Sequence, residues 1–195
     1  MLANVRFYKI LLKKNFLYTL LVLIFNFESI AIADEKQNII EKLKNTKSLK
    51  FKFNQKTNEK IEDGICYLVF PKKLKCDYKD KNQKELIINN NRLAITQKRY
   101  NKTFYYSVKK SPFIKILDKN QLINLIEESK LKYTNNQIHL TSLDNDKKIT
   151  ILFEKKNFDL IGWKINDQFE NKISFLINIL SINKETNLKI FEIPN

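Results

Sequence analysis

Apolar and polar residues alternate with a period of two along much of the chain, and this alternation restricts the fold more than any other feature. In "SLKFKFNQKT", Leu49, Phe51 and Phe53 fall on one side of an extended chain, while Lys50 and Lys52 fall on the other. Similar segments follow at hairpin spacing, with Asn-rich turns such as residues 89–91 between them. The expected strands are 48–57, 64–70, 74–79, 84–89, 92–98, 103–109, 131–134, 137–142, 148–154, 158–165, 172–180 and 188–193.

Two segments show helical spacing instead. Asp34 stands in N-cap position with Gln37 three residues later, which is a capping-box pattern, and the helix is expected to end near Thr46. Its apolar stripe consists of Ile39, Ile40 and Leu43. Pro112 opens a second helical region over residues 113–129, either one broken helix or two short ones. The apolar face of its first turn comprises Phe113, Ile116 and Leu117.

These elements predict a mainly β protein with some α structure. The chain contains no repeat, no Gly- or Ser-rich linker and no shift in composition that would mark a second domain. An antiparallel meander of so many strands must curl. The short helices are then expected to cover its apolar concave side.

The N-terminus predicts export. Four basic residues precede the apolar stretch 16–27: Arg6, Lys9, Lys13 and Lys14. This stretch is shorter than the roughly 20 residues of a membrane-spanning helix. Ala31 and Ala33 then form a small-x-small cleavage site. We expect a signal peptide over residues 1–33 and a single mature domain over residues 34–195; the alternative is a retained N-terminal anchor.

The only two cysteines, Cys66 and Cys76, lie on the two arms of one predicted hairpin, "GICYLVFPKKLKCDY". Their spacing differs from that of CxxC redox or zinc motifs. If the hairpin turns at Pro71, the two residues oppose each other, and in an oxidising compartment opposed thiols favour a disulfide. The alternative is a pair of buried apolar cysteines.

The positive charge has little diagnostic value. The formal net charge is +15, and it falls to +12 once the four basic residues and one acid of residues 1–33 are removed. Nearly all the positive residues are Lys, and only Arg92 and Arg99 remain after cleavage, which argues against guanidinium-based recognition of nucleic acid. We therefore expect no nucleic-acid partner.

We find no pattern that predicts an enzyme, a metal site or a cofactor. His139 is the only histidine and falls on a predicted strand, where a structural role is the usual one. Glu127 and Glu128 are adjacent on a predicted helix and so point apart. No HExxH, P-loop or GxGxxG motif occurs.

A face of large apolar side chains remains. Such residues usually fill a core. A curled sheet covered by short helices can instead keep a pocket for an acyl chain, with the helices as its lid. The candidate cavity residues are Phe51, Phe53, Leu68, Phe70, Leu74, Ile95, Phe104, Tyr106 and Trp163.

The order of these motifs resembles the LolA family of periplasmic lipoprotein carriers over nearly the whole expected mature chain. The similar segments are "SLKFKFNQ", the hairpin with Gly64, Pro71, Leu74 and Tyr78, "ELIINNNRLAIT", "SPFIKIL", "LIGWKINDQFENKISFLI" and "LKIFEIP".

The resemblance implies an unclosed antiparallel half-barrel of about eleven strands covered by short helices. It implies a monomeric periplasmic shuttle that takes acylated lipoproteins from an inner-membrane ABC transporter and delivers them to an outer-membrane receptor. The implied lid residues are Ile39, Ile40, Leu43, Phe113, Ile116 and Leu117. A sensor of lipids or lipoproteins, or a carrier of another amphiphile on the same scaffold, is the alternative.

One position departs from the family pattern. Many members have an Arg directly before the hairpin proline that hydrogen-bonds to the lid, and Phe70 stands there in this chain. We expect either apolar closure of the lid or a different residue in the polar role. The two cysteines share the strand parity of Phe70 and Leu74, so we expect them on the concave side.

Overall fold

A computed structural model describes residues 27–194, with the exception of residues 110, 145–146 and 167–169. The chain divides into two units, Met1–Asn38 and Ile39–Asn195, and the fold belongs to the second. The predicted signal peptide lies largely outside the described residues. Among the helices that the structure describes, none is long and apolar enough to cross a membrane.

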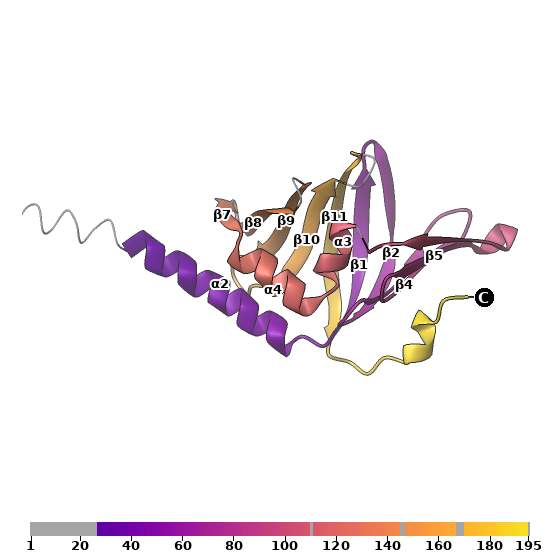
Figure 1. Ribbon diagram of the computed structural model, residues 1–195, viewed down its shortest axis with the longest axis horizontal. Helices are drawn as coiled ribbons and strands as arrows, with labels where there is room; N and C mark the ends of the chain where they lie inside the picture. Colours follow the sequence, from indigo (N-terminus) through magenta and orange to yellow (C-terminus); the bar gives the residue numbers. More distant parts are fainter. Residues whose placement is uncertain (1–26, 110, 145–146, 167–169, 195) are drawn as a thin grey trace, which may run out of the picture. The chain divides into compact units, whose positions relative to one another are not determined.

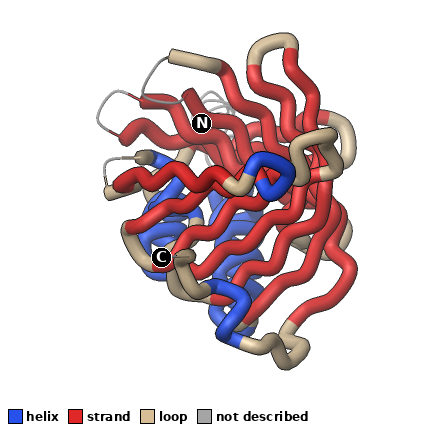
Figure 2. The backbone as a smooth tube through the Cα atoms, turned by 90° about the vertical axis from the view of Figure 1, so that its right-hand side faces the viewer, coloured by secondary structure: helices blue, strands red, loops and turns tan. Residues whose placement is uncertain are grey.

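The second unit is built on one antiparallel sheet of eleven strands (Figures 1 and 2). The spatial order is β6-β5-β4-β3-β2-β1-β11-β10-β9-β8-β7, and the end strands β6 and β7 do not pair with each other in the part of the chain that is described. The unclosed, mainly β fold is therefore confirmed. The strands are β1 Ser48–Thr57, β2 Lys60–Val69, β3 Lys73–Tyr78, β4 Lys84–Asn89, β5 Arg92–Gln97, β6 Lys102–Ser107, β7 Lys130–Thr134, β8 Gln137–Asp144, β9 Lys147–Glu154, β10 Leu160–Asn166 and β11 Lys172–Ile182.

The alternation predicted for β1 is present in the structure. Leu49, Phe51 and Phe53 are buried and Lys52 is exposed, because β1 lies at the centre of the sheet between β2 and β11 and turns one face toward the core. The β2–β3 hairpin has the predicted register, with Cys66 opposite Cys76.

Short helices cover the same face as the buried residues of β1. The helical region after Pro112 is two helices, α3 (Pro112–Ile116) and α4 (Lys119–Glu127), each with a side-chain N-cap. The Ser111 hydroxyl accepts from the amide of Phe113, and the Asp118 carboxylate accepts from the amides of Asn120 and Gln121. The apolar residues of these helices join the buried residues of the sheet in one core.

Two predictions about local structure are wrong. The first helix, α2 (Phe27–Asn45), begins upstream of Asp34, so Asp34 is not its N-cap. Glu28, Ala31 and Ala33 are good helix formers and allow the helix to extend. The predicted strand 188–193 is instead a short 3-10 helix, η2 (Leu188–Phe191), followed by an extended segment.

The reason for the second error lies in the sheet. Among the described residues, the segment does not reach either end strand of the sheet, β6 or β7, as a pairing partner; instead η2 packs against β3 and β4, which are already paired on both sides. Phe191 is fully buried there, and its backbone carbonyl accepts a hydrogen bond from the side-chain Nδ2 of Asn89 at 3.2 Å. An apolar segment can thus be buried by covering a sheet rather than by extending it.

Candidate binding cleft

An apolar cleft of about 190 Å³ lies between α3 and the concave face of the sheet. Its walls come from strands that are distant in sequence, β3–β5 on one side and β10–β11 on the other. None of the lining side chains is acidic or basic. The lining residues are Gln55, Leu74, Cys76, Tyr78, Leu86, Ile88, Leu93, Val108, Ser111, Phe113, Trp163, Ile165, Ile173 and Phe175.

A continuous row of aromatic rings crosses the concave face at this level. Trp163 stacks on Phe175 with ring centroids 4.6 Å apart, and Phe175 stacks on Phe53 at 4.9 Å. Phe53 then meets Tyr78 edge to face at 4.8 Å. The row spans β10, β11, β1 and β3, and such contacts add about 0.5–1.5 kcal/mol per pair beyond the buried area.

Gly64 on β2 permits the last contact of this row. It lies between Phe53 and Tyr78 in the strand register. A Cβ atom on Gly64 would collide with the backbone oxygen of Asp77 and would lie 2.8 Å from a ring carbon of Phe53. Because glycine has no side chain, the rings of β1 and β3 can touch across β2.

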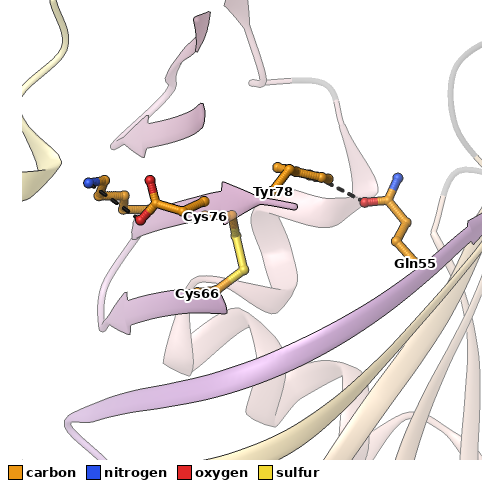
Figure 3. Close-up of a disulfide and its surroundings, with 6 residues drawn as sticks. Gln55, Cys66, Cys76 and Tyr78 are labelled. Carbon is orange, nitrogen blue, oxygen red and sulfur yellow. Dashed lines mark hydrogen bonds and ion pairs between the residues drawn. A yellow bond between two sulfur atoms is a disulfide. The ribbon is translucent and has the colours of Figure 1, made fainter. Parts of the chain in front are cut away.

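The disulfide between Cys66 and Cys76 fixes β2 to β3 beside this row (Figure 3). Both cysteines are buried in the core, and Cys76 also lines the cleft, so their predicted position on the concave side is confirmed. The structure decides for the bridge and against two free thiols.

Tyr78 carries one of the few polar groups of the cleft. Its hydroxyl donates to the Gln55 side-chain oxygen at 3.0 Å, and Figure 3 shows the ring reaching from β3 toward β1. Burial, with smaller effects from Glu62 and Asp80, raises the pKa of Tyr78 far above its usual value. The phenol is therefore neutral and satisfied, and the cleft offers no charge to a ligand.

The predicted cavity residues fall into three groups. Leu74 and Trp163 line the cleft. Phe51, Phe53 and Leu68 are buried in the core but do not line the cleft, and Phe70 packs partly buried against the same core. Ile95, Phe104 and Tyr106 lie further along the concave face on β5 and β6, where Phe104 and Tyr106 are 44% and 53% exposed. A lipid-binding role for all of them stays a prediction.

The sequence analysis missed most residues that line the cleft. Leu86, Ile88, Ile173 and Phe175 lie at alternate positions of their strands, so the period of two carried a signal for them. Each of these strands also has apolar residues of the opposite parity, such as Ile87 and Leu176. Without the strand order, the residues that face the concave side could not be distinguished from those that face the other side.

The predicted lid residues lie over this core. Ile39, Ile40, Leu43, Ile116 and Leu117 are buried. Phe113 is only partly buried, lines the cleft, and contacts Trp163 with ring centroids 5.5 Å apart. Phe113 packs against the same core as Ile116. The buried residues of α3 are Pro112, Ile114 and Ile116, and Ile114 was not among the predicted lid residues.

Lys72 supplies a polar contact between the β2–β3 turn and the helices. Its backbone amide donates to the Leu117 carbonyl at 2.7 Å, and its ammonium lies 2.9 Å from the Asp118 carboxylate. Burial alone would raise the pKa of Asp118, but Lys72 and the amides of Gln121 and Asn120 outweigh it and hold the pKa below its usual value. The turn that follows Phe70 is thus joined through Lys72 to the end of α3 and the start of α4.

A larger groove of about 600 Å³ lies at the ends of β1, β10 and β11. Its lining includes Lys56, Lys148, Lys164 and Lys172 together with Glu59 and Glu170. Burying apolar chains against so many charged groups would be unfavourable. The smaller cleft beneath α3 is therefore the candidate for an apolar ligand.

The residues associated with other chemistry are dispersed. His139 lies on β8 with its ring nitrogen 3.1 Å from the Gln137 side-chain oxygen, and burial together with Lys164 and Lys132 lowers its pKa. The described residues contain no group of three or more His, Cys, Asp or Glu side chains placed to bind a metal ion. Chemically, the cleft can hold an uncharged apolar group.

Several solved structures resemble the fold at low identity. The lipoprotein LppX of Mycobacterium tuberculosis aligns with 81% of this chain and 98% of its own, at 10% identity and a TM-score of 0.40. A LolA superfamily protein from Nitrosomonas europaea aligns with 80% of this chain and 96% of its own, at 8% identity and a TM-score of 0.39. A structure described as a putative outer membrane lipoprotein-sorting protein domain from Vibrio parahaemolyticus aligns with 83% of this chain and 94% of its own, at 11% identity and a TM-score of 0.44.

No curated protein matches the sequence. The family model described as "Outer membrane lipoprotein carrier protein LolA" matches residues 44–194, which include every strand of the sheet and both helices over the cleft. The chain belongs to the LolA family of outer membrane lipoprotein carrier proteins.

Proposed function

We propose that this protein is a periplasmic lipoprotein carrier that receives its cargo from an inner-membrane ABC transporter and releases it to an outer-membrane receptor. The observation that supports this proposal is the uncharged apolar cleft between α3 and the sheet of a LolA-family chain. The cargo's acyl chains occupy the cleft, and the cargo protein stays in water. Residues 1–33 serve as the export signal and are removed.

The physical need for such a cleft follows from the cargo. Each CH₂ group exposed to water costs about 0.8 kcal/mol, so a lipoprotein cannot cross an aqueous compartment with bare acyl chains. Leu93, Ile173 and Phe175 offer apolar surface with no hydrogen-bonding demand. Such a surface holds chains of different length, because no polar group fixes their position.

Loading requires the lid to move. The cleft of about 190 Å³ is smaller than the roughly 300–1,000 Å³ of ordinary small-molecule sites. The moving part is α3 with α4, since α3 has only five residues and its Phe113 ring closes the cleft over Trp163. Displacing Phe113 extends the cleft over rings that are already stacked on each other.

The test combines cargo recovery with a directed variant. The exported protein is purified from the periplasm and analysed by mass spectrometry under non-denaturing conditions, where an acylated protein should co-purify. Leu93→Glu puts a carboxylate into the cleft and should abolish recovery, because a buried unpaired charge is strongly disfavoured. Leu176→Glu on β11 is the matched control; Leu176 is 43% exposed and lies outside the cleft.

Depletion of the protein in its own host tests the transport step. Loss of a carrier should leave outer-membrane lipoproteins in the inner membrane, as measured by membrane fractionation. Recovery of an empty protein without affinity for acyl chains, or normal sorting after depletion, would contradict the proposal.

A further inference from the structure

Basic residues are frequent in and around β5 and β6 at one edge of the sheet, and several of them have no carboxylate partner among the described residues. Residues 86–117 contain no Asp or Glu, and their seven basic residues are Arg92, Lys98, Arg99, Lys102, Lys109, Lys110 and Lys115. Lys98 pairs with Glu85 and Asp77. Among the described residues, no carboxylate lies within ion-pair distance of Arg92, Arg99, Lys102 or Lys109.

The same edge exposes aromatic side chains. β6 is an end strand, and Phe104 and Tyr106 on it are 44% and 53% exposed. Tyr100, also 53% exposed, lies in the 3-10 turn η1 (Lys98–Tyr100) at the tip of the β5–β6 hairpin, at the right of Figure 1. Arg99 lies over the Tyr100 ring at 5.8 Å. We call Arg99, Tyr100, Lys102, Phe104 and Tyr106 the β6 patch.

The β6 patch continues the apolar face of the cleft. Tyr106 is opposite Leu93, which lines the cleft, and Phe104 is opposite Ile95 in the same register. Leu93 and Ile95 in turn are opposite Ile88 and Leu86 of the cleft wall. The apolar concave face therefore extends without interruption from the cleft to an edge that carries arginine and lysine.

We propose that the β6 patch docks on an anionic lipid bilayer. Arg99 and Lys102 contact lipid phosphates, and the rings of Tyr100, Phe104 and Tyr106 enter the headgroup region, where amphipathic aromatic side chains are most stable. Lysine and arginine bind anionic membranes through their charge, and the aromatic groups add buried apolar area. This interaction goes beyond the proposed exchange with membrane proteins, because it brings the cleft mouth to the lipid itself.

The test measures partition of the exported protein onto vesicles by sedimentation. The probes are vesicles of phosphatidylcholine with phosphatidylglycerol, and vesicles of phosphatidylcholine alone, each at low and high salt. Binding should require phosphatidylglycerol and should weaken with salt. Arg99→Gln with Lys102→Gln should lower partition about 25-fold, since each basic residue near an anionic surface contributes about fivefold. Tyr100→Ser should lower it further.

The matched control is Lys130→Gln with Lys132→Gln on β7, the opposite end strand, which changes the net charge equally. Three outcomes would overturn the proposal. Both double variants could lose partition equally, or the protein could bind neutral vesicles as well as anionic ones. The β6 patch could also form a dimer without any binding to vesicles. Binding of a fluorescent fatty acid by the cleft is measured in parallel. It should not change in Arg99→Gln with Lys102→Gln, so a failure of the carrier function and a failure of membrane docking remain distinguishable.

Discussion

Gly64 shows how one residue determines the contacts of two strands that are not neighbours. The aromatic row of the concave face crosses β2 only because Gly64 leaves room for Phe53 and Tyr78 to meet. Gly64→Ala should destabilise the fold by about 1–3 kcal/mol, the usual effect of overpacking, because a Cβ atom would push β2 away from the Asp77 carbonyl. Urea denaturation followed by tyrosine and tryptophan fluorescence measures this change. Ile61→Ala is the control: Ile61, on the same strand, is 63% exposed and should shift stability by less than about 0.5 kcal/mol.

The cysteines act at the same scale. Cys66 and Cys76 close a loop of only ten positions along the chain, so the bridge restricts the unfolded chain modestly. Replacing both by alanine should lower the free energy of unfolding by on the order of 2–3 kcal/mol, including the loss of buried sulfur. Denaturation in the presence of a reductant separates the contribution of the bridge from that of the buried sulfur atoms. The wild type should lose stability on reduction, and the double variant should not respond. An equal response of both proteins would contradict a stabilising role of the bridge.

At the scale of elements, the contact between the β2–β3 turn and the start of α4 is expected to control the opening of the proposed lid. Asp118→Asn keeps an N-cap but removes the ion pair with Lys72. We expect faster hydrogen exchange in α3 and α4 and faster uptake of a fluorescent fatty acid. Lys72→Gln and the double variant Lys72→Gln with Asp118→Asn complete a double-mutant cycle. The coupling energy between Lys72 and Asp118 should be on the order of 1 kcal/mol. Fully additive effects would exclude the ion pair as the link.

Acid should weaken the same contact. The pKa of Asp118 in the folded protein lies below its value in the unfolded chain, which is about 3.9. The contribution of Asp118 to stability is therefore complete above that pH and is lost as the pH falls through the lower, folded-state value. Exchange of the α3 and α4 amides, corrected for intrinsic rates, should accelerate below about pH 4 in the wild type. In Asp118→Asn, the exchange of these amides should accelerate much less over the same pH range.

Most elements could be predicted from the sequence because their evidence is local. The alternation of Leu49, Phe51 and Phe53 defines β1, and Pro112 marks the start of α3. The part played by Lys72 has no local evidence, because it depends on a turn and a helix start 46 positions apart in sequence. The segment 188–193 has an apolar pattern, but whether it pairs or packs depends on which strands are already paired.

For the whole molecule, the curl of the sheet followed from strand number and alternation, and its unclosed form was implied by the resemblance to the LolA family. A pocket beneath the helices was predicted as well, but most of the residues that line it were not. Predicting the cleft requires knowing that β3–β5 and β10–β11 face each other beneath α3, and only the register brings Leu74 and Ile173 to one space. An unclosed sheet also has to hold its outer strands without a closing partner. On the concave side α3 and α4 contribute, and on the opposite side the C-terminal segment does.

This C-terminal contact leads to a prediction about the stability of one half of the sheet. Phe191 is fully buried, its carbonyl accepts from Asn89 on β4, and the Pro194 carbonyl accepts from the Tyr105 hydroxyl on β6 at 3.1 Å. The segment thus fastens the end of the chain across the edge strands that carry the β6 patch. Phe191→Ala should destabilise the protein by about 3–5 kcal/mol. Hydrogen exchange should increase in β4, β5 and β6 and remain unchanged in β7–β9.

Leu188→Ala is the control, because Leu188 lies in the same 3-10 helix but is 53% exposed. It should leave hydrogen exchange unchanged in both halves of the sheet. A uniform increase over all strands would mean that the sheet unfolds as one unit and that the C-terminal segment has no selective hold on its open edge.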